Sequence, residues 1–363
     1  MGSSIFPDTT RNPYYIITNR YARTSAGIKA LHLLCHSLNA LGERAFLIID
    51  PFHPPQLSTH PDLLTPLLTS RIMESHFERG LTPITIYPET IPGNPYQAPF
   101  VVRYFLNYPG LLGGENSFDP SEFSISYSET LGRSIENNKL VLFIPTSDPS
   151  LFTPKPSVKR MGTCFYATKY LDVHNGNLLA VTKNSVQITR DRTDSPTPKQ
   201  IAELFRKSEL FYCYENSALV IEAILCGCPA VFLPNPYLTE SIGANEIGWD
   251  GIAWGTDPEE IERAKQTVMK ARENYLALFD IFWERLATFV EMTQEEVKTV
   301  PYGKQMAIPE DLSVTYGLLT QIKAAVSLFR YTARNSGLAY AFRRSFRRIL
   351  RKGIKIDLDR IGK

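Results

Sequence analysis

The sequence predicts an α/β protein of two domains, each built around a parallel sheet. In both halves of the chain, short apolar runs rich in β-branched and aromatic residues alternate with helical patterns. That alternation is typical of parallel sheets, in which helices connect successive strands. A length of 363 residues is too great for one ordinary core and suits two domains of about 150 residues each.

The composition is that of a water-soluble globular protein. Hydrophobic residues make up 43% and charged residues 21% of the chain, whose net charge is +2. These values exclude wholesale disorder and a polytopic membrane protein. The first twelve residues lack the basic and apolar pattern of a secretory signal, and no run of about 18 apolar residues follows. We therefore expect a cytoplasmic protein.

The cysteines indicate neither a disulfide framework nor a metal site. Their number is odd, and most stand inside apolar segments without the paired spacing of zinc ligands. We expect reduced, buried thiols, no metal and no cofactor. The five are Cys35, Cys164, Cys213, Cys226 and Cys228.

The first strand and helix predict a ligand-facing turn. A strand over 14–18 is followed by a loop and by a helix over 28–41 that ends at a glycine. Gly27 would let a ligand anion approach the helix N-terminus, although an ordinary turn explains it equally well. His32 and His36 lie on the polar side of this helix. They would contact an acceptor substrate or form a solvated face.

A proline-rich segment over 146–159 divides the chain and predicts a linker between domains. We expect an N-terminal domain over 1–150, a C-terminal domain over 160–310 and C-terminal helices over 311–363. Expected strands before the linker are 14–18, 45–49, 84–87, 123–127 and 140–145. Expected strands after it are 163–167, 186–189, 210–214, 230–233 and 251–254, with helices at 198–207, 218–225 and from 258 to about 296.

The stretch from Tyr212 to Asn235 carries the most chemistry. It has the pattern strand, polar loop, helix, glycine turn, strand. Ser217 would cap the helix, whose first turn offers free N–H groups to a phosphate. Glu222 would accept hydrogen bonds from a ribose diol. An exposed helix glutamate is the alternative.

This stretch resembles the donor-binding region of family-4-like glycosyltransferases of the GT-B fold, which reads Glu, a few residues, Glu-Ala, a small or apolar stretch, then Gly-x-Pro-Val. The resemblance implies two Rossmann-like domains that face a central cleft. It implies that Glu222 binds the ribose and that Glu215, Asn216 and Ser217 face the diphosphate and donor sugar. The register differs by one residue, because Tyr214 takes the strict position of the first glutamate. Glu215 either contacts the donor sugar as a catalytic residue or caps a helix, and retention of stereochemistry stays open.

Basic residues near strand ends are candidate diphosphate ligands. Lys169 follows the opening strand of the second domain, where such transferases commonly place a basic residue, and Arg190 is a second candidate. Lysine binds phosphate as a point charge and arginine as a bidentate donor. Lys183 and Arg192 are further candidates near later strand ends. For each of these residues, an exposed side chain without a specific contact is the alternative.

The segment over 86–107 is similar to sugar transferases of bacterial surface polysaccharide synthesis, including O-antigen and capsule enzymes. Glu89 follows a strand and would face the acceptor. An inverting enzyme needs a general base there, which Glu89 would supply, unless it only caps a turn. Arg103 stands on an otherwise apolar segment and needs a carboxylate or phosphate partner if it is buried. We expect it to contribute to acceptor binding.

The C-terminus carries an amphipathic basic helix in its sequence pattern, with apolar residues at helical spacing over 338–350. We expect it to bind the anionic inner face of the cytoplasmic membrane, or to pack across both domains. Nucleic-acid binding is disfavoured because the chain shows no recognised nucleic-acid module. The basic residues predicted to contact the membrane are Arg343, Arg344, Arg347, Arg348, Arg351 and Lys352.

Together these features predict a metal-independent glycosyltransferase. It would transfer a sugar from a nucleotide sugar to a saccharide or lipid-linked acceptor in surface polysaccharide synthesis. Two alternatives remain open, a GT-B epimerase acting on free nucleotide sugar and a catalytically silent scaffold on the membrane.

Overall fold

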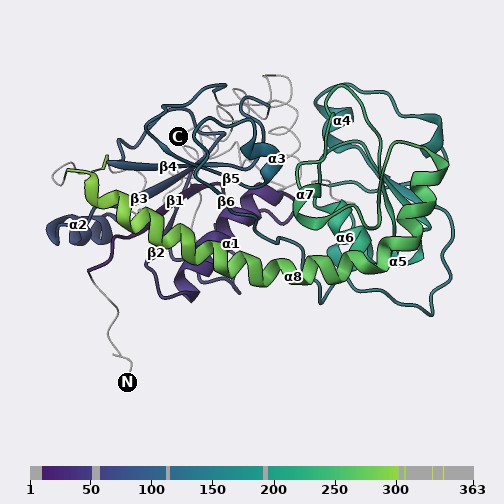
Figure 1. Cartoon of the computed structure of the whole chain (residues 1–363), viewed down its shortest axis with the longest axis horizontal. Coiled ribbons are helices and arrows are strands. Elements are labelled where there is room, and N and C mark those ends of the chain that lie inside the picture. Colours follow the sequence, from purple (N-terminus) through teal and green to yellow (C-terminus); the bar gives the residue numbers. More distant parts are fainter. Residues whose placement is uncertain are drawn as a thin grey trace, which may run out of the picture.

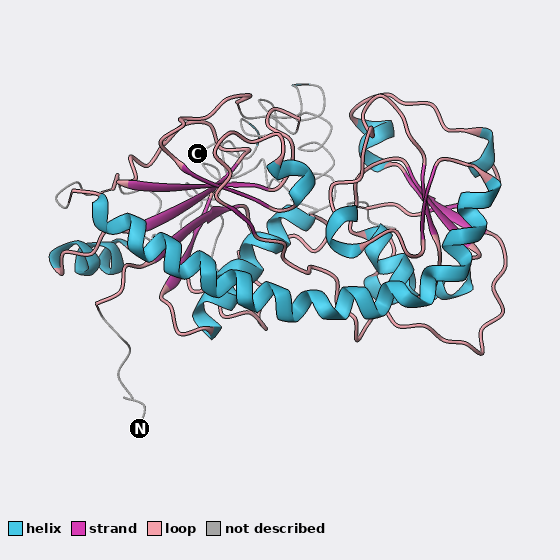
Figure 2. Cartoon of the chain, in the orientation of Figure 1, coloured by secondary structure: helices cyan, strands magenta, loops and turns pink. Residues whose placement is uncertain are grey.

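The structure, a computed structural model, describes residues 10–50, 58–111, 115–190, 195–301, 306–307, 329 and 338. Two α/β units are visible, each built around its own sheet (Figure 2). Every pairing between the named strands is parallel. Over the described ranges, the predicted fold class of two Rossmann-like domains is therefore confirmed.

The first unit holds a six-stranded sheet in the order β2-β1-β3-β4-β5-β6. Its strands are β1 (Tyr14–Thr18), β2 (Ala45–Ile49), β3 (Ile84–Pro88), β4 (Phe100–Phe105), β5 (Phe123–Ser126) and β6 (Leu140–Val141). Its helices are α1 (Ala26–Ala40), α2 (Ser70–Glu78) and α3 (Glu129–Gly132). The strand β4 and the helix α2 were not expected from the sequence.

The second unit holds a five-stranded sheet in the order β11-β10-β9-β7-β8. Its strands are β7 (Thr163–Tyr166), β8 (Val186–Gln187), β9 (Leu210–Cys213), β10 (Ala230–Phe232) and β11 (Ile252–Trp254). Its helices are α4 (Thr168–Asp172), α5 (Pro198–Lys207), α6 (Leu219–Leu225) and α7 (Ala244–Ile247), with a short 3₁₀ turn η2 (Ala180–Thr182). A second 3₁₀ turn, η3 (Val297–Thr299), follows the long helix described below, and its Val297 lies in the core of the first unit.

Strand order identifies where each sheet can hold a ligand. In the first sheet the order reverses between β1 and β3, and in the second it reverses between β7 and β9. Ligands of open α/β sheets bind outside the carboxyl ends of the strands at such a switch point. Glu89 directly follows β3, and Glu215 follows β9 by two residues. Both predicted carboxylates therefore stand at a switch point.

The helix α1 forms where expected because its N-terminus is capped. The Ser25 side chain accepts a hydrogen bond from the main-chain N–H of Ile28 at 3.4 Å, which satisfies one of the free N–H groups of the first turn. Leu31, Leu34 and Leu38 recur at helical spacing and are buried in the core of the first unit. This packing fixes α1 against the sheet and points its N-terminus past the end of β1.

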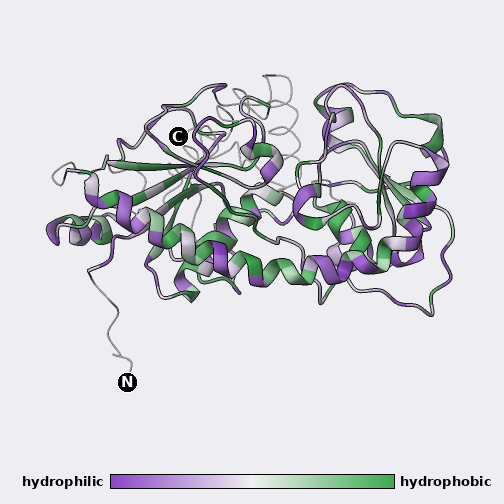
Figure 3. Cartoon of the chain, in the orientation of Figure 1, coloured by the Kyte–Doolittle hydropathy of each residue, from purple (hydrophilic) through white to green (hydrophobic). Residues whose placement is uncertain are grey.

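A single helix, α8 (Pro258–Glu296), belongs to the cores of both units. Asp257 caps its N-terminus by accepting hydrogen bonds from two main-chain N–H groups. Its first half contributes Val268 and Tyr275 to the core of the second unit, and its second half contributes Phe282 and Phe289 to that of the first. Figure 1 shows α8 running along one side of both units, and Figure 3 shows apolar and polar bands along it.

The predicted linker contains neither helix nor strand, but it is firmly attached. Arg206 donates hydrogen bonds to the carbonyls of Leu151 and Thr153, at 2.8 Å each. Arg272 donates to the carbonyls of Pro149 and Phe152, at 3.0 Å each. The linker therefore packs on the second unit. The boundaries at 150, 160 and 310 stay predictions, and the shared helix α8 shows that both units depend on residues after 258.

All five cysteines are free and buried, as expected. Within the described part of the chain, no helix is both long and apolar enough to span a bilayer. The same residues contain no group of three or more histidine, cysteine, aspartate or glutamate side chains that could hold a metal ion.

Candidate functional site

Glu222 lies where the two units meet. It stands in the first turn of α6 in the second unit, and its side chain is 7% exposed. Its Oε1 lies 3.9 Å from Nζ of Lys29, which comes from α1 of the first unit. Its Oε2 lies 3.9 Å from Nη2 of Arg190, which follows β8. The alternative of an exposed helix glutamate is therefore wrong.

The cations around Glu222 use few of their hydrogen-bond donors. Among the described residues, Lys29 makes one hydrogen bond, to a main-chain carbonyl 3.1 Å away, and Arg190 makes one at 2.7 Å. The nearby Arg23 makes one at 3.5 Å. By contrast, the structural Arg103 makes five and Arg160 makes three. Since a lysine carries three N–H groups and an arginine five, most donors of Lys29, Arg190 and Arg23 have no acceptor among the described residues.

These hydrogen bonds also join the units. Arg190 of the second unit donates to the carbonyl of Thr24 in the β1–α1 loop, and Lys29 of the first donates to that of Thr146 at the start of the linker. The Arg190 guanidinium also lies over the ring of Tyr166, 5.3 Å from its centroid. Lys29, Arg190, Arg23 and Glu222 are called the interunit charge cluster below.

The electrostatics of this cluster favour an anionic ligand. Burial raises the pKa of Glu222, while Lys29 and Arg190 pull it down. Burial lowers the pKa of Lys29, and Glu222 opposes that shift. Three cations and one carboxylate leave the cluster with an excess of positive charge. A diphosphate would meet several available N–H donors there.

The Glu215 carboxylate, at the switch point between β7 and β9, is hydrogen-bonded to the main chain. Its Oε2 accepts hydrogen bonds from the main-chain N–H groups of Lys169 at 2.6 Å and Tyr170 at 3.1 Å. The carboxylate therefore caps the N-terminus of α4, which was one of the two alternatives for this residue. Burial raises its pKa, and Lys169 is the largest opposing influence. The side chain of Lys169 is exposed. Contact of Glu215 with a donor sugar stays a prediction.

The two residues after Glu215, in the loop between β9 and α6, make hydrogen bonds that fix this loop. The Asn216 side chain donates to the carbonyl of Glu240 and accepts from the main-chain N–H of Ile242, both at 3.0 Å. The Ser217 hydroxyl accepts a hydrogen bond from the N–H of Leu219 at 3.3 Å, although the N-cap residue of α6 is Ala218, one position after the predicted Ser217. Tyr214 is buried, so the residue at the strict position of the first glutamate belongs to the core.

Glu89 is a buried carboxyl with an altered pKa. It is 3% exposed, and its Oε2 accepts a hydrogen bond from the N–H of Leu106 at 2.9 Å, just past β4. Burial raises its pKa to about 7. A Cβ added at Gly27 would lie 3.6 Å from Cδ1 of Leu106. Glu89 thus lies close to the N-terminus of α1.

Arg103 is a structural residue, which corrects the expectation that it binds an acceptor. It is fully buried on β4, and its Nε and Nη2 donate to the two oxygens of Glu122 at 2.8 and 2.7 Å. Its other N–H groups donate to the carbonyls of Pro88, Ile91 and Gly93. Because all five donors are satisfied inside the unit, none is left for a substrate. The partner it was expected to need is Glu122.

His32 of α1 is also structural, so its predicted solvated position and acceptor contact are corrected, whereas the acceptor contact of His36 stays a prediction. His32 is fully buried, and its Nε2 donates to the carbonyl of Asn19 at 3.0 Å. Burial lowers its pKa to about 4, so the ring is neutral. The half-buried His36 accepts through Nδ1 from the N–H of Leu64 at 3.0 Å. Both rings fasten the loops beside β1 and β2.

The sequence analysis missed Lys29 as a site residue. A signal was present, because a lysine in the first turn of a helix opposes the positive end of the helix dipole. Such a residue needs a compensating anion, which is Glu222 here. Gly27 stands beside it in the same turn, and a role for Gly27 in ligand approach stays a prediction. Lys183 is exposed. Arg192 and the predicted membrane residues Arg343, Arg344, Arg347, Arg348, Arg351 and Lys352 lie outside the described residues.

Comparison with protein-family models gives no match, and neither does comparison with curated protein sequences. Solved structures similar to this chain include AviGT4, a glycosyltransferase involved in avilamycin A biosynthesis (14% identity, 80% of this chain and 100% of that chain, TM-score 0.39). They also include WaaG, a glycosyltransferase involved in lipopolysaccharide biosynthesis (11%, 77% and 99%, TM-score 0.42). A third is the glycosyltransferase VinC in complex with dTDP (10%, 78% and 100%, TM-score 0.40). Likeness of this size assigns no substrate and no residue role to this chain.

Proposed function

We propose that this chain is a GT-B glycosyltransferase that binds a nucleotide sugar at the interunit charge cluster. The observation that carries the proposal is the position of Glu222 between Lys29 and Arg190, cations from different units that each make one hydrogen bond within the described part of the chain. A nucleoside diphosphate offers such a site a ribose diol for the carboxylate and phosphate oxygens for the cations.

The carboxylate and the cations of the cluster take different roles in this proposal. Glu222 accepts hydrogen bonds from the ribose, while Arg190 and Lys29 bind the diphosphate. The N-terminus of the 15-residue helix α1, with Gly27, adds main-chain N–H groups on the side of the first unit. Asn216 and Ser217 complete the donor side near Glu215. Lys169 reaches the diphosphate from α4.

The same cations stabilise the leaving group. As the glycosidic bond to the diphosphate breaks, negative charge grows on its oxygens, and preorganised lysine and arginine side chains lower the energy of that state. We therefore propose catalysis without a divalent cation. Activity that is unchanged in excess EDTA supports this point, and loss of activity that magnesium restores contradicts it.

Glu89 is the proposed general base for an inverting reaction. A base works best when its pKa lies near the operating pH, and burial brings that of Glu89 to about 7. It follows β3 at the switch point of the first unit, on the side where an acceptor hydroxyl would enter. In a retaining reaction, Glu89 would have no catalytic role and would only accept the hydrogen bond from the N–H of Leu106.

The acceptor in this proposal is a saccharide or a lipid-linked saccharide of bacterial surface polysaccharide synthesis. The support is the sequence resemblance of the segment over 86–107 together with the basic C-terminal pattern. We further propose that the protein works in the cytoplasm or at the inner face of the cytoplasmic membrane, where a lipid-linked acceptor would be presented.

Donor hydrolysis tests the proposal. The purified protein is incubated with UDP-, dTDP-, GDP-, ADP- and CMP-linked sugars, and release of nucleotide and free sugar is followed. We expect slow hydrolysis of one donor, reduced roughly 10-fold or more in Glu222→Ala, because hydrogen bonds to charged groups contribute about 1.5–3 kcal/mol. Glu273→Ala, an exposed change on α8, serves as the matched control.

The other outcomes separate the alternatives. An epimerase would convert one nucleotide sugar into its epimer, and both nucleotide sugars would then be present in solution. A silent scaffold would bind none of the donors. Either result would contradict the proposed transferase activity.

A further inference from the structure

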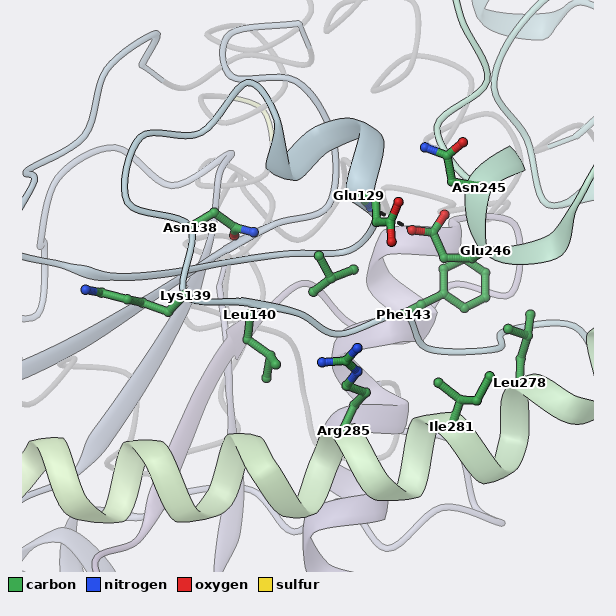
Figure 4. Close-up of a pocket in the computed structure, with 11 residues that line it drawn as sticks. Glu129, Asn138, Lys139, Leu140, Phe143, Asn245, Glu246, Leu278, Ile281 and Arg285 are labelled. Atoms are coloured by element: carbon green, nitrogen blue, oxygen red, sulfur yellow. Dashed lines mark hydrogen bonds between the residues drawn. The ribbon is translucent and has the colours of Figure 1, made fainter.

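A cavity of about 420 Å³ lies between the units, beside α8. Its walls come from α3 and the start of β6 on one side and from α7 and α8 on the other (Figure 4). Small-molecule sites occupy about 300–1,000 Å³, so the cavity is large enough for a ligand. None of its lining residues belongs to the interunit charge cluster. It is therefore a candidate site separate from the donor site.

Two buried acceptor atoms of residues that line this cavity have no hydrogen-bond partner within the described ranges. Glu246 of α7 accepts a hydrogen bond from the N–H of Glu129 at 2.6 Å through Oε1. Its Oε2 is buried and has no hydrogen-bond partner among the described residues, and the same holds for Oδ1 of Asn138. A buried acceptor without a partner is unfavourable by about 1–3 kcal/mol. A ligand that donates hydrogen bonds would relieve this cost.

The facing wall supplies donors. Arg285 rises from α8 toward β6 and α3, opposite Glu129 and Glu246 (Figure 4). No acceptor among the described residues lies within hydrogen-bond distance of its guanidinium. The Glu129 carboxylate is 62% exposed, and its ion pair with Arg133, at 3.9 Å, lies beyond hydrogen-bond distance. Donors and acceptors thus stand on opposite sides of one space.

Apart from Lys139 and Asn245, the remaining lining residues are apolar. Phe143 and Leu140 are buried in the wall of the first unit, whereas Ile281 on α8 is 48% exposed and points toward Phe143 (Figure 4). An exposed isoleucine beside a buried aromatic ring offers a surface that removes an apolar ligand face from water. The cavity therefore combines an apolar surface with polar groups of both kinds.

We propose that this cavity binds a pyranose ring of a glycan. A pyranose carries several hydroxyls, each of which donates one hydrogen bond and accepts others, so different hydroxyls can serve Arg285, Glu246 and Asn138. The C–H face of the ring would pack on Phe143 and Ile281. An anionic ligand would meet Glu129 and Glu246, and a cationic one would meet Lys139 and Arg285, so the balanced charge favours a neutral ligand. This site lies apart from the proposed donor site and would hold a second saccharide unit.

Saturation-transfer difference NMR tests this site. The probes are the methyl glycosides of glucose, galactose, mannose, N-acetylglucosamine and rhamnose, added to the full chain. We expect transfer to at least one of them, and at least a fivefold loss of that signal in Ile281→Trp, where the larger side chain fills the cavity. Arg285→Ala, an exposed change, should weaken the same signal without filling space.

Leu276→Trp is the matched control, because Leu276 is also exposed on α8 and does not line the cavity. Its signal should equal that of the unmodified chain. Nucleotide binding in Ile281→Trp should be unchanged, which separates this site from the proposed donor site and checks that the variant is folded. Absence of transfer to every probe, or equal transfer to the chain and Ile281→Trp, overturns the proposal.

Discussion

At the scale of single residues, the buried charges of this protein fall into two kinds that differ in how completely their donors are used. Arg103 gives all five N–H groups to protein acceptors, and Glu122 takes two of them. Lys29 and Arg190 each give one. The first kind holds the fold together, and the second kind suits a ligand. Burial alone does not distinguish them.

Replacement of Arg103 should destabilise the first unit strongly. In Arg103→Leu the carboxylate of Glu122, whose side chain is only 8% exposed, keeps its charge but loses its partner. Breaking a buried pair in this way costs about 3–5 kcal/mol. The double variant Arg103→Leu with Glu122→Leu should regain part of that loss. Urea unfolding measures both, and a double variant less stable than Arg103→Leu would contradict the account.

Glu89 should make the stability of the protein depend on pH. Its pKa is about 7 in the folded chain against 4.5 for an ordinary glutamate, so between these values the folded state holds more protons than the unfolded state. Stability contributed by the protonated carboxyl is present below about pH 4.5 and is lost as the pH rises through 7, on the order of 3 kcal/mol. Glu89→Gln should lack this loss. Melting temperatures of both proteins across this range test it, and parallel profiles would count against the assignment.

At the scale of elements, the N-terminus of α4 depends on a residue from another strand end. Its own N-cap, Ala167, makes no side-chain hydrogen bond, and Glu215 supplies the acceptor instead. The Glu215 carboxylate therefore connects the end of β9 with the helix that follows β7. It also explains why the local sequence of α4 gave little indication of a helix.

Loss of this cap should release α4. Glu215→Ala removes the acceptor for the N–H groups of Lys169 and Tyr170 and should cost about 0.5–2 kcal/mol. Glu215→Gln keeps a side-chain oxygen and should cost less. Amide hydrogen exchange at these two residues measures the effect directly. We expect faster exchange in the alanine variant, and equal protection in all three proteins would rule out the cap.

The regular elements were predictable where their sequence patterns were local. The strands β1 and β2 and the helices α5 and α8 have the apolar spacing and the capping residues that their positions require. The strand β4 was missed because Arg103 interrupts its apolar run, and only the distant Glu122 makes that arginine compatible with a sheet interior. The same reason applies to His32, whose burial is decided by the loop that packs on it.

At the scale of the whole molecule, the candidate site depends on how the two units meet. The motif that contains Glu222 could be recognised from the sequence because its residues are contiguous. Its pairing with Lys29 could not be recognised, because 192 residues (222 − 29 − 1) lie between the two positions in the sequence. Only the contact between the units brings them together. Further contacts link the units on the side of α3 and α7, where Asn245 donates to Thr130 at 3.1 Å.

The central claim is that the interunit charge cluster binds a nucleoside diphosphate through both its cations and its carboxylate. Isothermal titration calorimetry with UDP, dTDP, GDP and ADP, and with inorganic pyrophosphate, tests it in the unmodified chain and in Glu222→Ala. We predict that one nucleoside diphosphate binds and that Glu222→Ala weakens it about 10- to 100-fold. Pyrophosphate should bind the variant at least as well, because Lys29 and Arg190 lose a competing anion. An equal change for both ligands, or no nucleotide binding at all, would contradict the claim.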